Sequence, residues 1–177
     1  MKRVIVLKKK HKVLISISII LNIVLISIVI ISVIHMNDIT ERTFKTNAIN
    51  KLFELHKTLS KLENENWSDL DLLSIQLEDA SSSTAHALNI GVTSKTIKTM
   101  NQDDYEMLEL GALLKRYSFI TNPDFSAENV EKMKLELIRF NTILAENGFD
   151  NEEAIGSWTK QDYLKKVRNI VSELEKE

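Results

Sequence analysis

The longest apolar pattern in the chain runs from residue 13 to residue 34, where 22 consecutive residues carry no charge and 17 are Ile, Leu or Val. As a helix this run is about 33 Å long, close to the roughly 30 Å hydrocarbon core of a bilayer. The run is longer than the apolar region of a signal peptide, and no A-x-A-like cleavage site follows it. The pattern therefore predicts one uncleaved membrane-spanning helix.

A stripe of small and large apolar residues follows the span. We expect residues 37 to 64 to continue outward as a helix whose core-facing positions are Ala48, Leu52, Leu55, Leu59 and Leu62. The four leucines are also candidates for contact with a partner. This stripe lies roughly 200° around an uninterrupted helix from a polar seam in the span. Two interpretations stay open: the helix breaks between residues 40 and 47, or its two faces serve different contacts.

The polar seam of the span consists of Ser18, Asn22 and Ser32, which follow the alternating spacing of a helix contact face. Asn22 lies near the bilayer midplane, where an amide side chain can form a hydrogen bond to Asn22 of a second copy or to a partner helix. We keep these three residues as candidates for contact between membrane helices. A homodimer, a partner span and a tolerated lone polar residue all stay open.

Four later helices share one type of start. An apolar residue is followed directly by a capping residue, and a second apolar residue lies five positions after the first. The predicted N-caps are Ser68, Asn101, Ser126 and Thr159. The helices that follow them are expected at residues 69–90, 102–121, 127–146 and 160–175.

Helix stops are predicted where Asn, Gly and Pro cluster. These stops are Asn89 to Gly91, Asn122 before Pro123, and Asn147 with Gly148. The longer connections at 91–100 and 148–158 are expected to cross the end of the domain or to form an extended flap. The predicted fold is all-α, with a single N-terminal transmembrane helix followed by an extracytoplasmic antiparallel helical bundle of about five helices.

Charge divides the chain into parts of opposite sign. Residues 1–12 hold six basic residues and no acid, whereas residues 35–177 hold 17 Lys and Arg against 25 Asp and Glu, a net charge of −8. Because Lys and Arg accumulate on the cytoplasmic flank of a span, the N-terminus is expected in the cytoplasm. The predicted organisation is a cytoplasmic basic tail (1–12), a transmembrane helix (13–34) and an extracytoplasmic helical domain (35–177). We interpret the tail as an orientation signal attracted to anionic lipid, not as a nucleic-acid ligand.

Candidate chemistry is sparse. The stretch 79–87 is rich in small polar residues and holds Ser83, Thr84 and His86, which we keep as ligand or packing candidates. A tight helix crossing is the favoured interpretation, and a small-ligand pocket is the alternative. No paired metal-ligand spacing involves His56 or His86, and the acids at residues 103–109 are those of a capped helix start. The chain has no cysteine, so thiol chemistry and disulfides are excluded.

The sequence predicts no catalytic residue, metal or cofactor. The leading hypothesis is a single-pass, membrane-anchored interaction or accessory protein of the bacterial cell envelope that binds a protein partner. One alternative is an immunity or toxin-neutralising protein at the envelope. Another is a small-ligand-sensing bundle or an envelope hydrolase that uses His86 or the acids Asp103 and Asp104.

Overall fold

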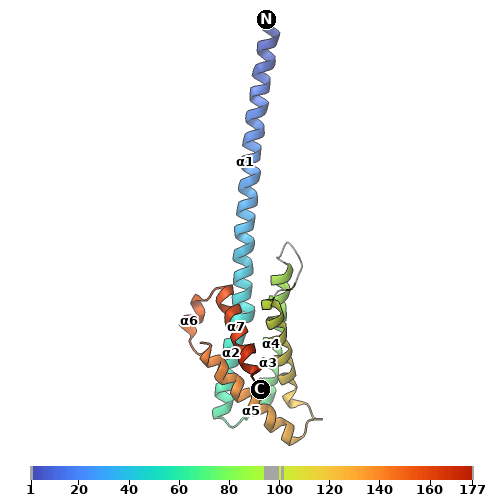
Figure 1. Ribbon diagram of the computed structural model, residues 1–177, viewed down its shortest axis with the longest axis vertical. Coiled ribbons are helices and arrows are strands. Elements are labelled where there is room, and N and C mark those ends of the chain that lie inside the picture. Colours follow the sequence, from blue (N-terminus) through green and yellow to red (C-terminus); the bar gives the residue numbers. More distant parts are fainter. Residues whose placement is uncertain (1, 94–99, 101, 177) are drawn as a thin grey trace. The chain divides into compact units, whose positions relative to one another are not determined.

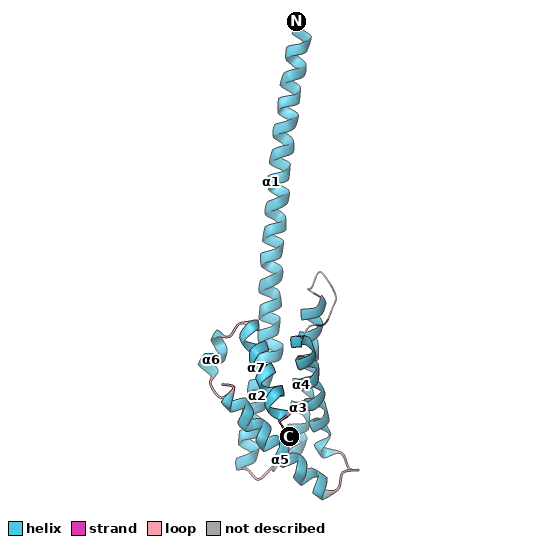
Figure 2. Cartoon of the chain, in the orientation of Figure 1, coloured by secondary structure: helices cyan, strands magenta, loops and turns pink. Residues whose placement is uncertain are grey.

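The computed structural model describes residues 2–93, 100 and 102–176, which form helices and short connections (Figure 1). Helix accounts for 87% of the chain, and no strand occurs in the described ranges (Figure 2). The predicted all-α class is therefore confirmed. The chain divides into two compact units, Met1–Ile39 and Thr40–Glu177.

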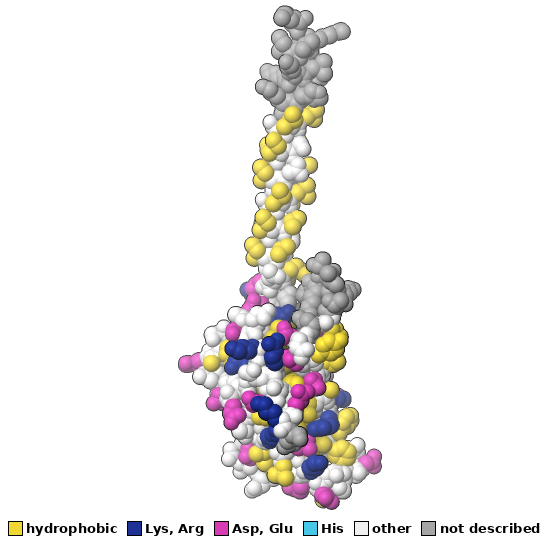
Figure 3. Space-filling model, in the orientation of Figure 1, with side chains coloured by type: hydrophobic (Ala, Val, Ile, Leu, Met, Phe, Trp, Pro, Cys, Tyr) yellow, Lys and Arg dark blue, Asp and Glu magenta, His cyan; other side chains and the backbone are white. Residues whose placement is uncertain are grey.

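The first unit is formed by helix α1, which spans Lys2–Phe44 and crosses the boundary between the units after Ile39. Every Ile, Leu and Val between positions 13 and 34 exposes 48% to 65% of its surface. Figure 3 shows hydrophobic side chains along this helix. A continuous apolar surface of this kind is unfavourable in water and matches the interior of a bilayer. Among the described residues, this is the one helix long and apolar enough to cross a membrane.

The second unit begins with the last residues of α1, and its described residues form six further α-helices and two short helical segments of other types. Predicted and observed bounds agree within one residue for the helices predicted at 127–146 and 160–175, and the helix predicted at 102–121 corresponds to α4 with η2. The elements are η1 (Lys45–Ile49), α2 (Asn50–Asn64), α3 (Leu70–Thr93), α4 (Gln102–Ser118), η2 (Phe119–Thr121), α5 (Ala127–Glu146), α6 (Glu152–Ser157) and α7 (Lys160–Leu174).

The predicted caps of α5 and α7 are confirmed. Ser126 Oγ accepts a hydrogen bond from the backbone N–H of Asn129 at 3.2 Å. Thr159 and Asp162 form a capping box, in which each side chain accepts from the other residue's backbone N–H, at 3.3 and 2.9 Å. These bonds satisfy N–H groups that a helix start leaves without an intrahelical partner.

Helix α3 begins one residue later than predicted. Asp69, not Ser68, caps it, because Asp69 Oδ1 accepts from the N–H of Leu72 at 2.9 Å. The preceding turn contains two consecutive left-handed residues, Asn66 (φ 53°) and Trp67 (φ 59°), and this turn sets where the helix can begin. Aspartate and serine are comparable caps, so the sequence did not separate them. Asn101, the cap predicted for α4, lies outside the described residues.

Two predicted connections differ from the structure. Helix α3 continues through Gly91 to Thr93 instead of ending at residues 89–91, because one glycine weakens a helix interior by only about 1 kcal/mol. The segment 148–158 contains the short helix α6 instead of an extended flap, and the side chain of Asn151 caps it by accepting from the N–H of Ala154. Residues 94–99 of the other connection lie outside the described residues.

The end of α5 is as predicted. Gly148 has φ +85°, a left-handed conformation that glycine adopts without steric cost. The N–H groups of Gly148 and Phe149 donate to the carbonyls of Ala145 and Leu144, at 2.8 and 3.0 Å. The chain then turns so that the rings of Phe149 and Trp158 meet edge to face, with centroids 5.0 Å apart. Gly148 therefore ends α5 and starts the turn into α6.

Residues 40–47, the segment predicted to hold a possible helix break, are helical: α1 continues to Phe44 and is followed by a π-helix, Lys45–Ile49. Phe44 and Asn50, which flank Lys45–Ile49, both have right-handed helical backbone angles, so the helix does not break there. A π-helix bonds each residue to the fifth along the chain and so adds a residue to the turn. The 200° offset expected for an uninterrupted α-helix therefore does not apply across this segment.

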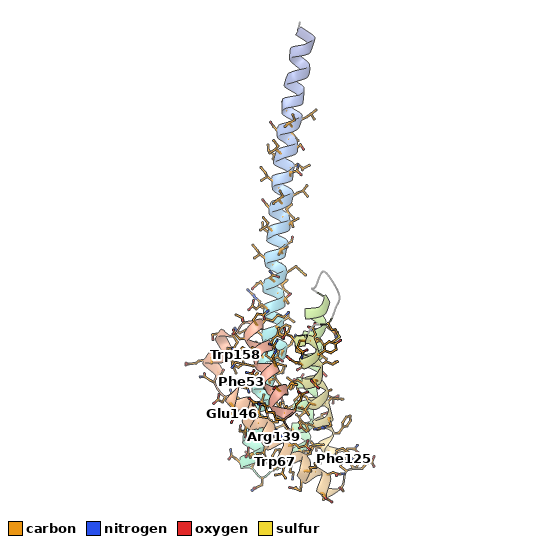
Figure 4. All side chains as sticks on the ribbon, viewed as in Figure 1. Phe53, Trp67, Phe125, Arg139, Glu146 and Trp158 are labelled. Carbon is orange, nitrogen blue, oxygen red and sulfur yellow. The ribbon has the colours of Figure 1, made fainter. Side chains whose placement is uncertain are left out.

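The core of the second unit contains the apolar stripes predicted from the sequence, together with buried residues outside those stripes such as Phe44, Ile49 and Phe149. Phe44 and Tyr163, both buried, meet in this core with ring centroids 5.7 Å apart, in an edge-to-face contact. Figure 4 shows Trp67 and Phe125 at one end of this unit and Phe53 and Trp158 toward the other. Buried members of the stripes include Leu73, Leu77, Ala80, Thr84, Ala87, Met107, Leu110, Leu114, Tyr117, Leu137, Phe140, Leu144, Leu164, Val167, Ile170 and Val171.

Candidate functional site

The polar residues of the span lie within α1 and are exposed in the first unit. The side-chain amide of Asn22 donates one hydrogen bond to the backbone carbonyl of Ser18 at 2.9 Å. Ser32 is exposed farther along the same helix. Such a bond to the preceding turn satisfies part of a polar side chain's hydrogen-bonding capacity in a lipid environment.

The leucine stripe of α2 is fully used inside the second unit. Leu52, Leu55, Leu59 and Leu62 expose at most 1% of their surface, as expected for core-facing residues. A partner could reach these side chains only if the unit opened. A surface for protein binding must therefore be sought elsewhere on the folded unit.

The small-residue stretch of α3 packs against α4. Ser81 Oγ donates to the carbonyl of Gly111 at 2.8 Å, and Thr84 Oγ1 donates to the carbonyl of Ala80 at 2.8 Å. A Cβ placed on Gly111 would lie 3.8 Å from the carbonyl oxygen of Ser81 and from a methyl carbon of Thr84. Small side chains on both helices thus allow a close crossing.

The three ligand candidates of this stretch have different surroundings. Thr84 is 1% exposed in the interface with α4, Ser83 is half-buried, and His86 is exposed. No hydrogen bond joins His86 to another side chain in the described part of the chain. Thr84 is therefore buried whereas His86 is exposed to solvent, so the two side chains lie in different environments.

The acids at the start of α4 pair with a cation from α7. The guanidinium of Arg168 donates to the carboxylates of Asp103 and Glu106, with a separation of 3.3 Å to Glu106. Glu106 also accepts from the side-chain amide of Gln102 at 3.0 Å. The two carboxylates raise the pKa of Arg168. No group of three His, Asp or Glu side chains arranged to hold a metal ion occurs among the described residues.

A partly buried polar cluster between α2 and α5 was not predicted. His56 Nδ1 donates to Asn141 Oδ1 at 2.7 Å, since an amide oxygen only accepts. The amide nitrogen of Asn141 donates to Ser60 Oγ at 3.1 Å. Asn141 is 7% exposed and lies 85 residues from His56 in sequence, so no local pattern indicates the pair.

An open groove of about 680 Å³ lies between α6 and the segment formed by η1 and α2. Its charged residues largely pair with the protein itself. Lys57 Nζ lies 3.1 Å from a carboxylate oxygen of Glu152, and Lys45 Nζ donates to the carbonyl of Gly156. The remaining walls include Phe53, whose ring lies 4.1 Å below Lys57. These pairings link α6 to α2 and to the π-helix.

Three contacts fix the register of α3 against α4. The residue numbers of these contacts rise along α3 as they fall along α4. Ser74 Oγ donates to the carbonyl of Ser118 at 2.5 Å, Lys115 pairs with Glu78, and Ser81 bonds to Gly111. The two helices are therefore antiparallel neighbours. This register places exposed residues of one helix beside exposed residues of the other.

One outward surface, which we name the α3–α4 outer face, results from this register. Its positions recur every three or four residues on both helices, the spacing that a packed helix presents to a neighbour. Figure 3 shows hydrophobic side chains on the α4 side of the second unit. The α3–α4 outer face consists of Ile75, Glu78, Ser82, Ala85 and Asn89, and of Tyr105, Leu108, Ala112, Lys115 and Phe119.

The α3–α4 outer face has large apolar side chains toward its ends and small side chains in the middle. Ile75 exposes 64% of its surface and Phe119 47%, next to the ion pair of Glu78 with Lys115. Lys115 also lies over the Phe119 ring, with its Nζ 5.4 Å from the centroid. Toward the other end, Leu108 is 51% and Tyr105 is 56% exposed. Exposed apolar side chains gathered on one face mark interaction sites.

Comparison with known proteins adds no functional assignment. No protein-family model, no curated protein and no solved structure matches this sequence. The function is therefore inferred from the surfaces described above.

Proposed function

We propose that this protein is a single-pass, membrane-anchored interaction or accessory protein of the bacterial cell envelope. In this proposal the apolar run of α1 spans the membrane with its basic N-terminal tail in the cytoplasm, in agreement with the charge asymmetry. The second unit, an antiparallel helical bundle, lies outside the cytoplasm and binds a protein partner. The α3–α4 outer face is the observation that carries the proposal, because it is an exposed apolar surface on a unit whose leucine stripes are already buried.

The partner that fits the α3–α4 outer face is an amphipathic helix. Tyr105 and Phe119 are 14 positions apart, which corresponds to about 21 Å of helix, or four turns. Ser82, Ala85 and Ala112 lie between the apolar ends, and small side chains let a helix backbone approach closely. A helix laid along the α3–α4 outer face would cover the exposed side chains of Ile75 and Leu108 with its own apolar stripe.

The ion pair between Glu78 and Lys115 places charge on the face, next to its end at Ile75 and Phe119. Both side chains are about half exposed, so their attraction contributes little to the stability of the unit. A partner helix with a polar residue at the matching turn would keep this pair solvated or hydrogen-bonded, whereas a purely apolar stripe would desolvate it. The pair therefore favours one register of the partner helix over others.

The test uses full-length protein captured from detergent-solubilised cells, with a photo-crosslinking residue placed at Ala112. We expect one protein to be cross-linked through a helical segment, and its recovery to fall with Leu108→Glu and with Phe119→Glu. Charging an apolar contact residue of an interface typically weakens binding by about 5-fold to 30-fold. Leu135→Glu on α5, where the native side chain is 68% exposed, is the matched control and should leave recovery unchanged.

Two results would count against the proposal. The first is equal recovery of the cross-linked protein with Leu108→Glu, Phe119→Glu and Leu135→Glu, which would place the contact away from the α3–α4 outer face. The second is the absence of any cross-linked protein while the wild-type chain is folded and in the membrane. Tryptophan fluorescence during urea unfolding checks folding, because both tryptophans, Trp67 and Trp158, lie in the second unit.

A further inference from the structure

Asn22 is the one amide side chain in the apolar run, and it lies near its centre. Nine residues of the run precede it and twelve follow it, so it is within about 2 Å of the midpoint along the helix axis. Its Nδ2 donates to the Ser18 carbonyl at 2.9 Å. The position is therefore the one where a polar side chain is farthest from the water on either side of a bilayer.

The hydrogen-bonding capacity of Asn22 is only partly used within α1. A primary amide has two N–H donors and a carbonyl oxygen acceptor. One N–H reaches Ser18, whereas the second N–H and Oδ1 have no hydrogen bond to any residue in the described part of the chain. The neighbouring Ser27 differs, because its hydroxyl donates its single proton to the Ile23 carbonyl at 2.9 Å. In a hydrocarbon core no water satisfies the remaining amide groups of Asn22.

We propose that a second copy of this chain packs against the span and pairs its Asn22 with this one. In a parallel pair of identical helices the two Asn22 side chains lie at the same depth, and each can donate its remaining N–H to the other's Oδ1. Both unused donors and both unused acceptors are then paired, which an apolar partner helix cannot do. A lone polar residue at a helix contact also fixes the register of a parallel pair. The inference rests on the proposed membrane anchoring of α1.

The contact face of this dimer is the seam through Asn22. Residues Leu25 and Val29 follow it at helical contact spacing, while Val24 and Ile31 lie on the opposite side of the helix. All four are apolar and exposed in the single chain, so they differ only in their position around the helix. This makes them a matched set for cross-linking.

The absence of cysteine from the chain makes the test direct. Full-length single-cysteine variants at these four positions are placed in vesicles of phosphatidylcholine and phosphatidylglycerol, with no other protein present, and oxidised. We expect disulfide-linked dimers from Leu25→Cys and Val29→Cys at several times the yield from Val24→Cys and Ile31→Cys. In the Leu25→Cys background, Asn22→Leu should weaken dimerisation by about 3-fold to 30-fold.

Controls separate the dimer from the membrane anchor. Ser27→Leu removes a polar side chain about 140° around the helix from Asn22 and should leave the dimer yield unchanged. Equal disulfide yields at all four positions, or a yield unaffected by Asn22→Leu, would overturn the dimer while the anchor stands. Extraction of the protein from the vesicles by alkaline carbonate would overturn the anchor and the dimer together.

Discussion

Gly111 offers a sharp test of how α3 and α4 pack. A glycine facing small residues on a neighbouring helix is commonly read as a requirement for close approach, which predicts that any side chain there would destabilise the fold. The distances indicate otherwise for alanine. A Cβ on Gly111 would meet Ser81 O and Thr84 Cγ2 at 3.8 Å, an ordinary van der Waals separation. The hydrogen bond from Ser81 uses the Gly111 backbone carbonyl, which Gly111→Ala retains.

The expected effect of Gly111→Ala is stabilisation. Glycine in a helix interior costs about 0.5 to 1 kcal/mol relative to alanine, because glycine loses more conformational freedom on folding. With an m-value of about 1 to 3 kcal/mol/M, the urea midpoint should rise by about 0.2 to 1 M. Gly111→Leu should have the opposite sign, since a larger side chain has no space and overpacking typically costs about 1 to 3 kcal/mol.

The assay is urea unfolding of the full-length protein in a non-ionic detergent, followed by tryptophan fluorescence. Both tryptophans belong to the second unit, so the transition reports on that unit and not on the span. A fall in the urea midpoint for Gly111→Ala, by an amount similar to that for Gly111→Leu, would show that the helices approach more closely than described. It would refute the reasoning about the α3–α4 crossing.

Three further perturbations can be measured in the same way. Tyr163 has a fully buried hydroxyl that forms no hydrogen bond in the described residues, and burial raises the pKa of this hydroxyl. Tyr163→Phe should therefore change the free energy of unfolding by less than about 1 kcal/mol. Tyr163→Ala should lower the free energy of unfolding by about 3 to 5 kcal/mol, because it removes the buried ring. Hydrogen bonds from the backbone N–H and the hydroxyl of Thr159 hold the pKa of Asp162 in the folded protein below its ordinary 3.8. The ionised carboxylate therefore stabilises the fold at pH values above 3.8. This contribution is lost as the pH falls through the lowered pKa of the folded protein. Urea midpoints between pH 2.5 and 6 should therefore fall less steeply with acid in Asp162→Asn, and equal slopes would contradict the cap. Asn141→Ala should lower the free energy of unfolding by about 1 to 3 kcal/mol, because it leaves His56 and Ser60 without their partner; an unchanged midpoint would show that the cluster adds nothing.

Helix positions and core faces were predictable because both depend on local patterns. Leu110, Leu114 and Tyr117 recur at helical spacing and are all buried, and Ser126 and Thr159 cap their helices as expected. The misplaced boundaries arise where local preferences are nearly equal. Ser68 and Asp69 are comparable caps, and Gly91 is only a weak helix breaker when no proline follows.

The candidate site could not be predicted because it depends on how helices register against each other. Ile75 and Phe119 belong to different helices, and their shared surface follows from the bonds of Ser74, Glu78 and Ser81 to α4. The same reason applies to His56 and Asn141, which only tertiary packing brings together. Sequence periodicity shows which residues are exposed, but not which exposed residues become neighbours.

The central claim is that α1 anchors the chain in a membrane with the second unit outside the cytoplasm. Labelling of single cysteines tests it most directly, using Lys61→Cys in α2 and Lys9→Cys in the basic tail, with a membrane-impermeant maleimide on intact bacterial cells whose outer layers are permeable to the reagent. Lys61 is exposed on the second unit, so a cysteine there is accessible when the unit faces the reagent. We predict rapid labelling of Lys61→Cys and labelling of Lys9→Cys only after the membrane is opened. Labelling of Lys9→Cys but not Lys61→Cys in intact cells would contradict the orientation, and recovery of both variants in the soluble fraction would contradict the anchor.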